Sequence, residues 1–427
     1  MLFNYTVGNS LNENFSKVKV SKKFLLAIGI IANLLLLGYF KYMDFFIENF
    51  NTLFDGNIPM LHLALPLAIS FFTFQQIAYL VDSYRAETKE YDFLNYSLFV
   101  TFFPQLIAGP IVHHKEMMPQ FASKWNLVKN YKNIALGLFI FSIGLFKKVI
   151  IADQFAGWAS AGFDKAETLT LIEGWVTSLS YTFQLYFDFS GYTDMAIGVA
   201  LLFNIKLPIN FNSPYKAKDI QDFWRRWHMT LSRFLRDYIY IPLGGNRKGN
   251  FHTYSNIMAT FILGGLWHGA AWTFVFWGFL HGMALVIHRT WKNLGFTMNV
   301  FVAWFLTFNF INISWVFFRA KEWDDATKVL KAMFGMSGIE FSSKYADKLD
   351  FLHEYGVTFG EWLHHIDGNK SVSWIVIGLL LVLFSKNSME ISKSFKANRK
   401  YLIFMLLVLL TALSSMSQFS EFLYFNF

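Results

Sequence analysis

The sequence predicts an all-α protein that crosses a membrane several times. Of its 427 residues, 54% are hydrophobic and 15% are charged, whereas soluble domains carry roughly 25% charged residues. The apolar residues also occur in runs long enough to enter or span a bilayer. These runs do not alternate in the manner of barrel strands, and helices are the other structure that satisfies its backbone hydrogen bonds within lipid.

The positions of these runs predict about ten membrane-embedded helices. The runs cover residues 24–40, 61–81, 93–112, 133–151, 174–204, 254–288, 298–318, 372–385 and 401–418. The run 254–288 is long enough for a helical hairpin. The motif PQLIAGP at 104–110 places two prolines and a glycine in an apolar run, which predicts a broken or re-entrant segment. The run 174–204 is expected to be interrupted at Ser190 and Gly191.

The distribution of basic residues predicts the orientation of the chain. Four lysines precede the first run: Lys17, Lys19, Lys22 and Lys23. Segments 206–250 and 386–400 are also rich in Lys and Arg, and such segments remain on the cytoplasmic side. We therefore expect a single integral-membrane domain over 1–427, with a cytoplasmic N-terminus, a cytoplasmic loop at 206–253, an external loop at 319–371 and an external C-terminus.

The composition argues against several kinds of protein. The chain has no cysteine, which excludes disulfides, zinc–thiolate sites and a thioester on an enzyme cysteine. The net charge is +8, but the basic residues lie in loops between apolar runs, where anionic lipid headgroups account for them. Nucleic-acid binding is therefore not expected.

The 11 histidines raise the question of a metal. His113–His114 and His364–His365 are adjacent pairs, whose side chains are expected to point apart on a helix. No HExxH spacing is present. His281 and His288 share a helix face without an obvious third ligand. A metal site is therefore not expected.

His268 is the residue that most strongly suggests chemistry. It lies near the middle of 254–288, a run without Lys, Arg, Asp or Glu. An ionisable group at membrane depth is costly unless it is paired or faces a cavity, and small residues such as Gly265 and Gly269 permit close approach. His268 is either a hydrogen-bonded packing residue, a general base for a hydroxyl, or a nucleophile that carries an acyl group.

The segment Lys218–Tyr240 reads as one amphipathic helix. Its apolar positions are Phe223, Trp227, Leu231, Phe234 and Tyr238. Its polar positions are Gln221, Arg225, His228, Ser232 and Arg236. The helix either lies at the membrane interface with its basic residues at the headgroups, or covers a cavity in which His228 and the arginines face an anionic ligand.

The turn IPLGGNRKG at 241–249 follows directly. Its proline, glycines, Asn246, Arg247 and Lys248 predict a tight basic turn. The turn is either a plain connector or a cradle in which backbone amides and Arg247 hold a phosphate. The spacing of a P-loop is absent.

Two acidic residues, Asp188 and Asp194, lie inside a mostly apolar run. Buried carboxylates require partners. Asp188 and Asp194 either belong to a structural network between helices, or line an ion path, a proton path or a polar tunnel.

Several motifs taken together resemble the membrane-bound O-acyltransferases. The strongest are FNSPYKAKDIQDFWRRWHMTLSRFLRDYIYIPLGG and LGGLWHGAAWTFVFWGFLHG. DFSGYTDMAIG, PQLIAGPI, WVFFRA and the terminal EFLYFNF are similar to the bacterial branch that includes alginate and peptidoglycan O-acetyltransferases. The IPLGGNRKG turn favours this branch over the branch that transfers D-alanine to teichoic acids.

The resemblance implies a helical bundle around a transmembrane tunnel, with re-entrant and interfacial helices and an acyl donor that enters from the cytoplasm. It also implies that His268, in the Trp-His-Gly match, is catalytic and that His228 is the second histidine of a pair. The expected donor-binding residues are Arg225, Arg226, Trp227, Asn246, Arg247, Asp188, Asp194 and Trp267. Members of this branch usually begin with additional helices, so the N-terminus is expected to be shortened.

The expected function is the transfer of an acetyl group across the inner membrane to a cell-envelope polysaccharide. Acetyl-CoA is the expected donor substrate, no bound cofactor is expected, and a periplasmic acetyltransferase-like or esterase-like protein is the expected partner. Three alternatives remain: transfer of D-alanine or another acyl group to teichoic-acid polymers, proton-coupled transport through Asp188 and Asp194, and a membrane scaffold without chemistry.

Overall fold

The computed structural model describes every residue except 13–20, 89–91, 107–108, 417–422 and 424–427. Lys17, Lys19, two residues of the PQLIAGP motif and most of the EFLYFNF motif lie outside the described residues. Helices make up nearly all of the regular secondary structure in the described chain, apart from one two-stranded sheet. The all-α fold class is therefore confirmed.

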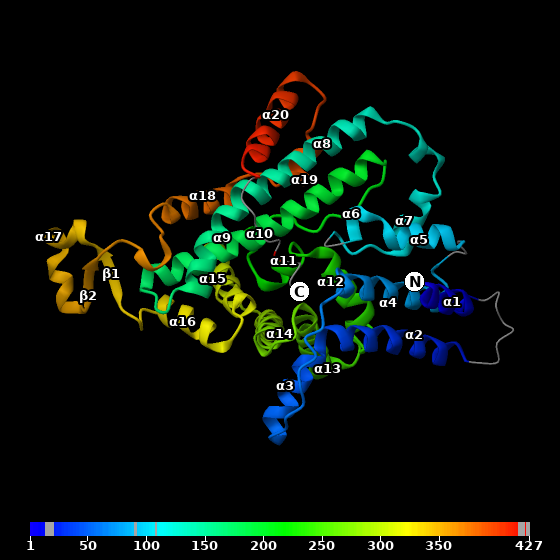
Figure 1. The fold of residues 1–427 in the computed structure, drawn as a ribbon, viewed down its shortest axis with the longest axis horizontal. Coiled ribbons are helices and arrows are strands. Elements are labelled where there is room, and N and C mark those ends of the chain that lie inside the picture. The colour runs from blue at the N-terminus through cyan, green and yellow to red at the C-terminus, as the bar shows by residue number, and fades with distance from the viewer. Residues whose placement is uncertain (13–20, 89–91, 107–108, 417–422, 424–427) are drawn as a thin grey trace.

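The centre of the molecule is a pair of long helical segments that run side by side (Figure 1). The first contains α8 (Tyr131–Phe146) and α9 (Asp153–Ser160), which the π-helical η4 (Lys147–Ala152) joins; the π-helical η5 (Ala161–Lys165) follows. The second is α10 (Leu171–Leu202). Glycines allow their close contact, because a Cβ atom on Gly144 would lie 2.5 Å from the carbonyl oxygen of Gly191.

Helix α10 is continuous, so the predicted interruption at Ser190 and Gly191 is wrong. Gly191 does not break the helix because its lack of a side chain is used for packing: a Cβ atom there would lie 2.7 Å from the carbonyl oxygen of Gly144. Tertiary contact thus outweighs the low helix propensity of glycine.

The run 254–288 forms the predicted hairpin, with α13 (Gly249–His268) and α14 (Trp272–Asn293) on either side of a short turn. Helix α15 (Val300–Arg319) packs against α14. Two glycines bring α13 and α14 together. A Cβ atom on Gly265 or on Gly278 would lie 2.3 Å from a carbonyl oxygen of the other helix. This close packing fixes the end of α13, where His268 lies.

The elements of the N-terminal part are α1 (Leu2–Leu11), α2 (Lys22–Leu37), the π-helical η2 (Gly38–Tyr42), α3 (Met43–Phe54), α4 (Ile69–Tyr84), α5 (Phe93–Thr101), α6 (Phe103–Leu106), α7 (His114–Phe121) and η3 (Lys124–Leu127). Of these, α1, α2 and α4 pack on one another at one side of the molecule (Figure 1). The predicted helix 61–81 begins only at Ile69. His62 and Ala68 have positive φ angles of 47° and 61°, and the carboxylate of Asp44 holds the backbone amides of Leu61 and His62.

The prediction of one continuous amphipathic helix over Lys218–Tyr240 is wrong. The segment contains α11 (Ile220–Trp224), α12 (Met229–Leu235) and the π-helical η7 (Arg236–Tyr240), with η6 (Pro214–Lys216) before them. The chain breaks at His228, whose φ angle is 41°. Phe223, Trp227 and Phe234 are buried in the main core, so this segment packs inside the bundle.

The 319–371 segment carries structure of its own at one end of the molecule (Figure 1). It contains α16 (Trp323–Met333), β1 (Ile339–Ser342), η8 (Ser343–Tyr345), α17 (Ala346–Leu349), η9 (Asp350–Tyr355), β2 (Val357–Gly360) and η10 (His364–Ile366). Strands β1 and β2 pair in parallel, with Ile339 opposite Val357. Helices α18 (Ser371–Phe384), α19 (Ser388–Lys393) and α20 (Arg399–Ser414) follow.

Three described helical stretches are long and apolar enough to cross a membrane: Lys22–Phe54, Tyr131–Lys165 and Val300–Arg319. The shorter helix Ser371–Phe384 is also apolar. These stretches agree with a polytopic membrane protein. The number of about ten embedded segments and the orientation of the chain stay predictions.

Candidate active site

His268 is the last residue of α13, and its side chain is 3% exposed. Aromatic rings surround it. The centroid of its imidazole lies 4.9 Å from that of Trp267, 5.3 Å from that of Trp277 and 5.0 Å from that of Phe318. Three elements, α13, α14 and α15, therefore enclose the imidazole. The passage to it that a tunnel would provide stays a prediction.

Lys41 of η2 holds the end of α13 from the other side. Its Nζ donates hydrogen bonds to the carbonyl oxygens of Trp267 at 2.6 Å and His268 at 3.2 Å, and to Ser70 Oγ at 3.1 Å. The last carbonyl groups of a helix lack partners within the helix and carry partial negative charge, which a cation satisfies. Tyr42 adds a hydrogen bond of 2.8 Å to the carbonyl oxygen of Leu266. The backbone of His268 is thus fixed by N-terminal residues.

His228 forms the junction between α11 and α12 and is completely buried. Its Nδ1 lies 3.1 Å from Oδ1 of Asn210. The same oxygen accepts hydrogen bonds from the backbone amide of Thr230 at 3.2 Å and from its hydroxyl at 2.9 Å. The hydroxyl oxygen of Thr230 in turn accepts from the backbone amide of Ile111 at 3.0 Å. A conformation unusual for a residue with a side chain is therefore supported by several contacts.

These contacts also fix the tautomer of His228. A backbone amide donates only, so the atom of Asn210 that receives the Thr230 amide must be the oxygen. That oxygen accepts from Nδ1 of His228, so a neutral His228 carries its proton on Nδ1 and a lone pair on Nε2. Nε2 is buried and has no hydrogen-bond partner among the described residues. His228 therefore offers a buried proton acceptor.

The two histidines belong to one aromatic core. Phe74 of α4 stacks on Trp267 at 4.7 Å and on Phe234 of α12 at 4.0 Å. Trp315 connects Trp227, at 5.0 Å, with Trp277, at 5.6 Å. Trp227 and Trp267, which neighbour the two histidines in the sequence, both belong to this core. The structure thus brings His228 and His268 into one region, as the resemblance implies.

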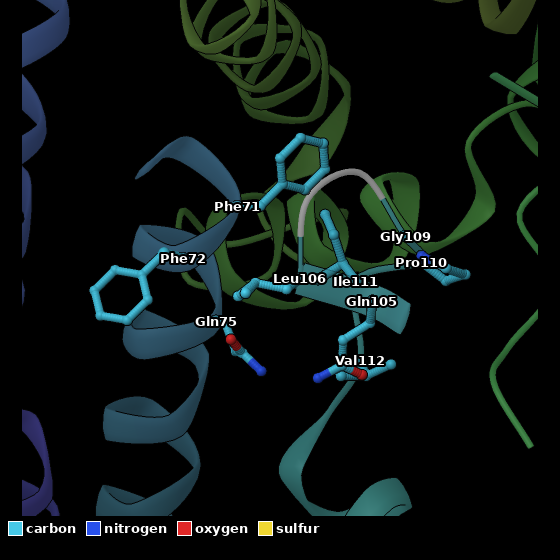
Figure 2. Close-up of a pocket in the computed structure, with 9 residues that line it drawn as sticks. All are labelled: Phe71, Phe72, Gln75, Gln105, Leu106, Gly109, Pro110, Ile111 and Val112. Carbon is cyan, nitrogen blue, oxygen red and sulfur yellow. The ribbon is translucent and has the colours of Figure 1, made fainter. Parts of the chain in front are cut away.

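A small cavity lies between α4 and the segment 105–112 (Figure 2). Its volume is about 20 Å³, which accommodates about one water molecule and no acyl chain. The side-chain amides of Gln75 and Gln105 both donate to the carbonyl oxygen of Phe99, at 3.2 and 3.0 Å. Phe71 and Ile111 also line the cavity. The ring centroid of Phe71 lies 5.3 Å from that of Trp267. Two residues that line this cavity thus contact the histidine-bearing elements: Phe71 contacts Trp267, and Ile111 donates to Thr230.

His281 shows what a structural histidine looks like in this protein. Its Nδ1 accepts a hydrogen bond from Trp224 Nε1 at 3.2 Å, and its Nε2 lies 3.0 Å from Ser314 Oγ. Both nitrogens are therefore satisfied. His288, the other histidine on this face, lies 3.7 Å from a carboxylate oxygen of Asp219.

Asp188 and Asp194 are both buried and both paired with lysines. Asp194 Oδ2 lies 2.7 Å from Lys147 Nζ, and Asp188 Oδ1 lies 2.9 Å from Lys148 Nζ. Lys148 also pairs with Asp153 at 2.7 Å. These contacts join η4 to α10 and match the structural network among the alternatives. A role for the two aspartates in donor binding stays a prediction.

The expected donor-binding residues separate into two groups. Trp227 and Trp267 are buried in the aromatic core, and Arg226 is held by Asp222 at 2.9 Å and by the carbonyl oxygen of Asn212 at 3.3 Å. Arg225, Asn246 and Arg247 are exposed. The 241–249 turn is tight, as predicted, because Gly244, Gly245 and Gly249 adopt positive φ angles.

Lys41 and Asn210 did not emerge from the sequence pattern. Lys41 follows the first apolar run and continues the same helical stretch, so a lysine at membrane depth was a usable signal. Asn210 lies in a stretch without regular secondary structure, and its contact with His228 spans 18 residues. No local pattern reveals such a pair.

Residues 75–321 match the model of the MBOAT, membrane-bound O-acyltransferase family, and this range contains both histidines. The chain is 52% identical over 424 residues to the peptidoglycan O-acetyltransferase of Helicobacter pylori, covering 92% of this chain and 80% of that protein. It is 40% identical over 348 residues to the probable alginate O-acetylase AlgI of Pseudomonas aeruginosa, covering 80% and 66%. It is 30% identical over 247 residues to the teichoic acid D-alanyltransferase of Streptococcus thermophilus, covering 55% of this chain and 59% of that protein.

Proposed function

The chain belongs to the membrane-bound O-acyltransferase family, and we propose that it moves an acetyl group from a cytoplasmic donor across the inner membrane for O-acetylation of a cell-envelope polysaccharide. It is a membrane protein and an O-acyltransferase. The observation that carries the proposal is the pair of buried histidines, His228 and His268, which dedicated hydrogen bonds hold inside the matched region.

The proposed chemistry is acyl transfer assisted by an imidazole. The oxygen of the accepting hydroxyl attacks the carbonyl carbon of a thioester while His268 takes the hydroxyl proton. The carbon–sulfur bond breaks, and the departing thiolate receives a proton. In the variant route, a nitrogen of His268 first takes the acetyl group and then passes it to the hydroxyl. His228, with its lone pair on buried Nε2, orients the reacting groups or assists proton transfer.

Acetyl-CoA is the proposed donor substrate. Its phosphates require cationic partners, and arginine binds phosphate through a planar pair of donors. Arg225 and Arg247 are exposed, which leaves them free to approach a ligand from solvent. Arg226 is less suited because Asp222 and the Asn212 carbonyl already occupy it. We therefore assign donor binding chiefly to Arg225 and Arg247.

The proposed acceptor lies outside the cytoplasmic membrane. The relatives at 52% and 40% identity are named for peptidoglycan and for alginate, and we propose a polysaccharide of this kind. We also propose that a periplasmic acetyltransferase-like or esterase-like protein completes the transfer. The 319–371 segment, with its own small sheet, would then face that partner.

The decisive experiment is thioester consumption by the purified protein in detergent. We expect the wild-type protein to release free thiol from acetyl-CoA in the presence of a hydroxyl acceptor. The variant His268→Ala should lose this activity by on the order of 100-fold or more, as is typical when a general base is removed. The variant His353→Ala, which changes an exposed histidine of the 319–371 segment, serves as the control. Equal rates for His268→Ala and wild type, at equal amounts of folded protein, would contradict the proposal.

Two alternatives make different predictions. Transfer of D-alanine is favoured by the 30% identity to a D-alanyltransferase, and it predicts consumption of a D-alanyl thioester in place of acetyl-CoA. Proton-coupled transport predicts uptake that survives removal of His268 and depends on Asp188 and Asp194. The lysine partners of these aspartates give no support to a proton path.

A further inference from the structure

A cluster of side chains that could bind a metal lies outside the candidate active site. Glu173 of α10 and His364 and His365 of η10 each offer one ligand atom, and these atoms all lie within 4.8 Å of one another. We propose that this cluster, together with Glu340, binds a divalent transition-metal cation of the Zn²⁺ type. The cation would fix the 319–371 segment to the start of α10.

The two histidines face one another, so the prediction that their side chains point apart is wrong. Their ring centroids are 3.7 Å apart. The reason is the backbone, because η10 is not part of a regular α-helix. Leu363 before it and Asp367 after it have positive φ angles of 53° and 47°. Such conformations are costly and persist where the surroundings enforce them, and here they direct both imidazoles toward one place.

Glu173 supplies a buried negative charge to the cluster. The residue is 1% exposed. Its Oε2 lies 2.8 Å from His365 Nδ1 and also accepts from the backbone amide and the hydroxyl of Thr170, each at 3.0 Å. Its Oε1 accepts from the backbone amide of His365 at 3.0 Å. In the described part of the chain, no Lys or Arg pairs with Glu173. A buried carboxylate requires compensation. The neutral donors around Glu173 supply part of it, and a metal ion would add a positive charge.

Glu340 lies beside the three clustered residues and is the fourth ligand that we propose. Its Oε1 lies 3.6 Å from His364 Nδ1. Strand β2 leaves space for this carboxylate at Gly360, where a Cβ atom would lie 2.5 Å from Glu340 Oε1. Two imidazoles and two carboxylates form a nitrogen and oxygen donor set that suits Zn²⁺.

The three clustered ligand atoms of Glu173, His364 and His365 need only a small contraction to bind one cation. Zinc bonds to nitrogen and oxygen of about 2.0–2.2 Å place tetrahedral ligand atoms about 3.4 Å apart. Atoms up to 4.8 Å apart must therefore approach by at most about 1.4 Å. His364 is exposed, so its side chain has room to rotate by this amount.

The test is a metal titration of the full chain in detergent after removal of bound metals with a chelator. We expect the wild-type protein to take up about one Zn²⁺ per chain in competition with a chelating indicator. Co²⁺ should give the strong visible absorption of a tetrahedral site. The double variant His364→Ala/His365→Ala should lose both signals. The control His353→Ala, in the same segment, should retain them.

A second variant keeps the proposal testable where the double variant fails to fold. Glu340→Gln removes a ligand charge while leaving the hydrogen bonds of Glu173 intact, and should weaken Zn²⁺ binding by on the order of tenfold or more. Zn²⁺ uptake by the wild type that equals that of folded Glu340→Gln, or an absent Co²⁺ spectrum, would overturn the proposal. The readout does not involve acyl transfer, so the result is independent of the proposed function.

Discussion

At the scale of single residues, the site depends on contacts that fix two imidazoles. The sequence alone suggests His268 as a functional residue, because an ionisable side chain in a long apolar run is costly unless it has a role. The tautomer of His228 is not suggested, because it follows from Asn210 and Thr230, which approach it only in the folded chain. The sequence therefore predicted which histidines matter, but not which ring nitrogen of His228 carries the proton.

Removing the amide of Asn210 should impair transfer. In Asn210→Leu, Nδ1 of His228 loses its acceptor, so the imidazole no longer keeps its lone pair on Nε2. Partners that orient a metal-bound imidazole contribute about 10- to 100-fold to affinity or activity, and we expect a fall of similar size in acetyl transfer. The rate of thioester consumption measures the effect. Asn309→Leu removes an amide that donates to the carbonyl of Phe305 in its own helix, and should leave the rate unchanged.

Removing the ammonium group of Lys41 should displace His268. In Lys41→Met, the carbonyl oxygens of Trp267 and His268 lose their shared donor, and hydrogen bonds to charged groups are worth about 1.5–3 kcal/mol. A free-energy loss of about 1.4 kcal/mol corresponds to a tenfold change. We therefore expect the rate of acetyl transfer to fall about tenfold or more. Lys22→Met changes an exposed lysine at the start of the same helical stretch and should behave as wild type. Wild-type rates in Lys41→Met would remove Lys41 from the site.

At the scale of elements, the long apolar runs were predictable and their breaks were not. The α13–α14 hairpin was expected from the length of its run. The break in the 218–240 segment was not, because its amphipathic pattern favours one helix. It is the hydrogen bonds around His228 and the burial of Trp227 that stabilise two short helices in its place.

Glycine packing between α8 and α10 provides a stability test. In Gly144→Val, the new side chain must occupy space 2.5 Å from the carbonyl oxygen of Gly191. Overpacking of this kind typically costs about 1–3 kcal/mol, so the thermal midpoint in detergent should fall. Gly157 of α9 has open space around its Cβ position, and Gly157→Val is the matched control. Equal midpoints for both variants would show that the two helices are not held in close contact at Gly144.

At the scale of the whole molecule, charge bias predicts a sidedness that helix packing alone does not. The basic 241–249 turn and the 319–371 segment are expected on opposite sides of the membrane. The small sheet within the latter was not predicted, because strands of four residues carry too few positions for a periodic pattern.

Labelling of introduced cysteines tests this sidedness without background, because the chain contains no cysteine of its own. Tyr355→Cys places a thiol at a side chain that is 77% exposed, and it should react with a membrane-impermeant maleimide in spheroplasts, whose outer membrane barrier is removed. Lys248→Cys, in the exposed turn, should react only after the cytoplasmic membrane is permeabilised. The reverse pattern would invert the proposed orientation and place the acetyl donor on the wrong side.

The ion pairs between η4 and α10 bear on how the protein is made. A lysine or aspartate left alone at the centre of a bilayer costs about 2.5–3.5 kcal/mol, and here Lys147 and Lys148 find Asp194 and Asp188 on a helix that is synthesised later. If the insertion machinery released each helix separately, the charges of these lysines and aspartates would be exposed to lipid without a partner. Both helical stretches should therefore leave the translocon as one unit, with their charges already neutralised.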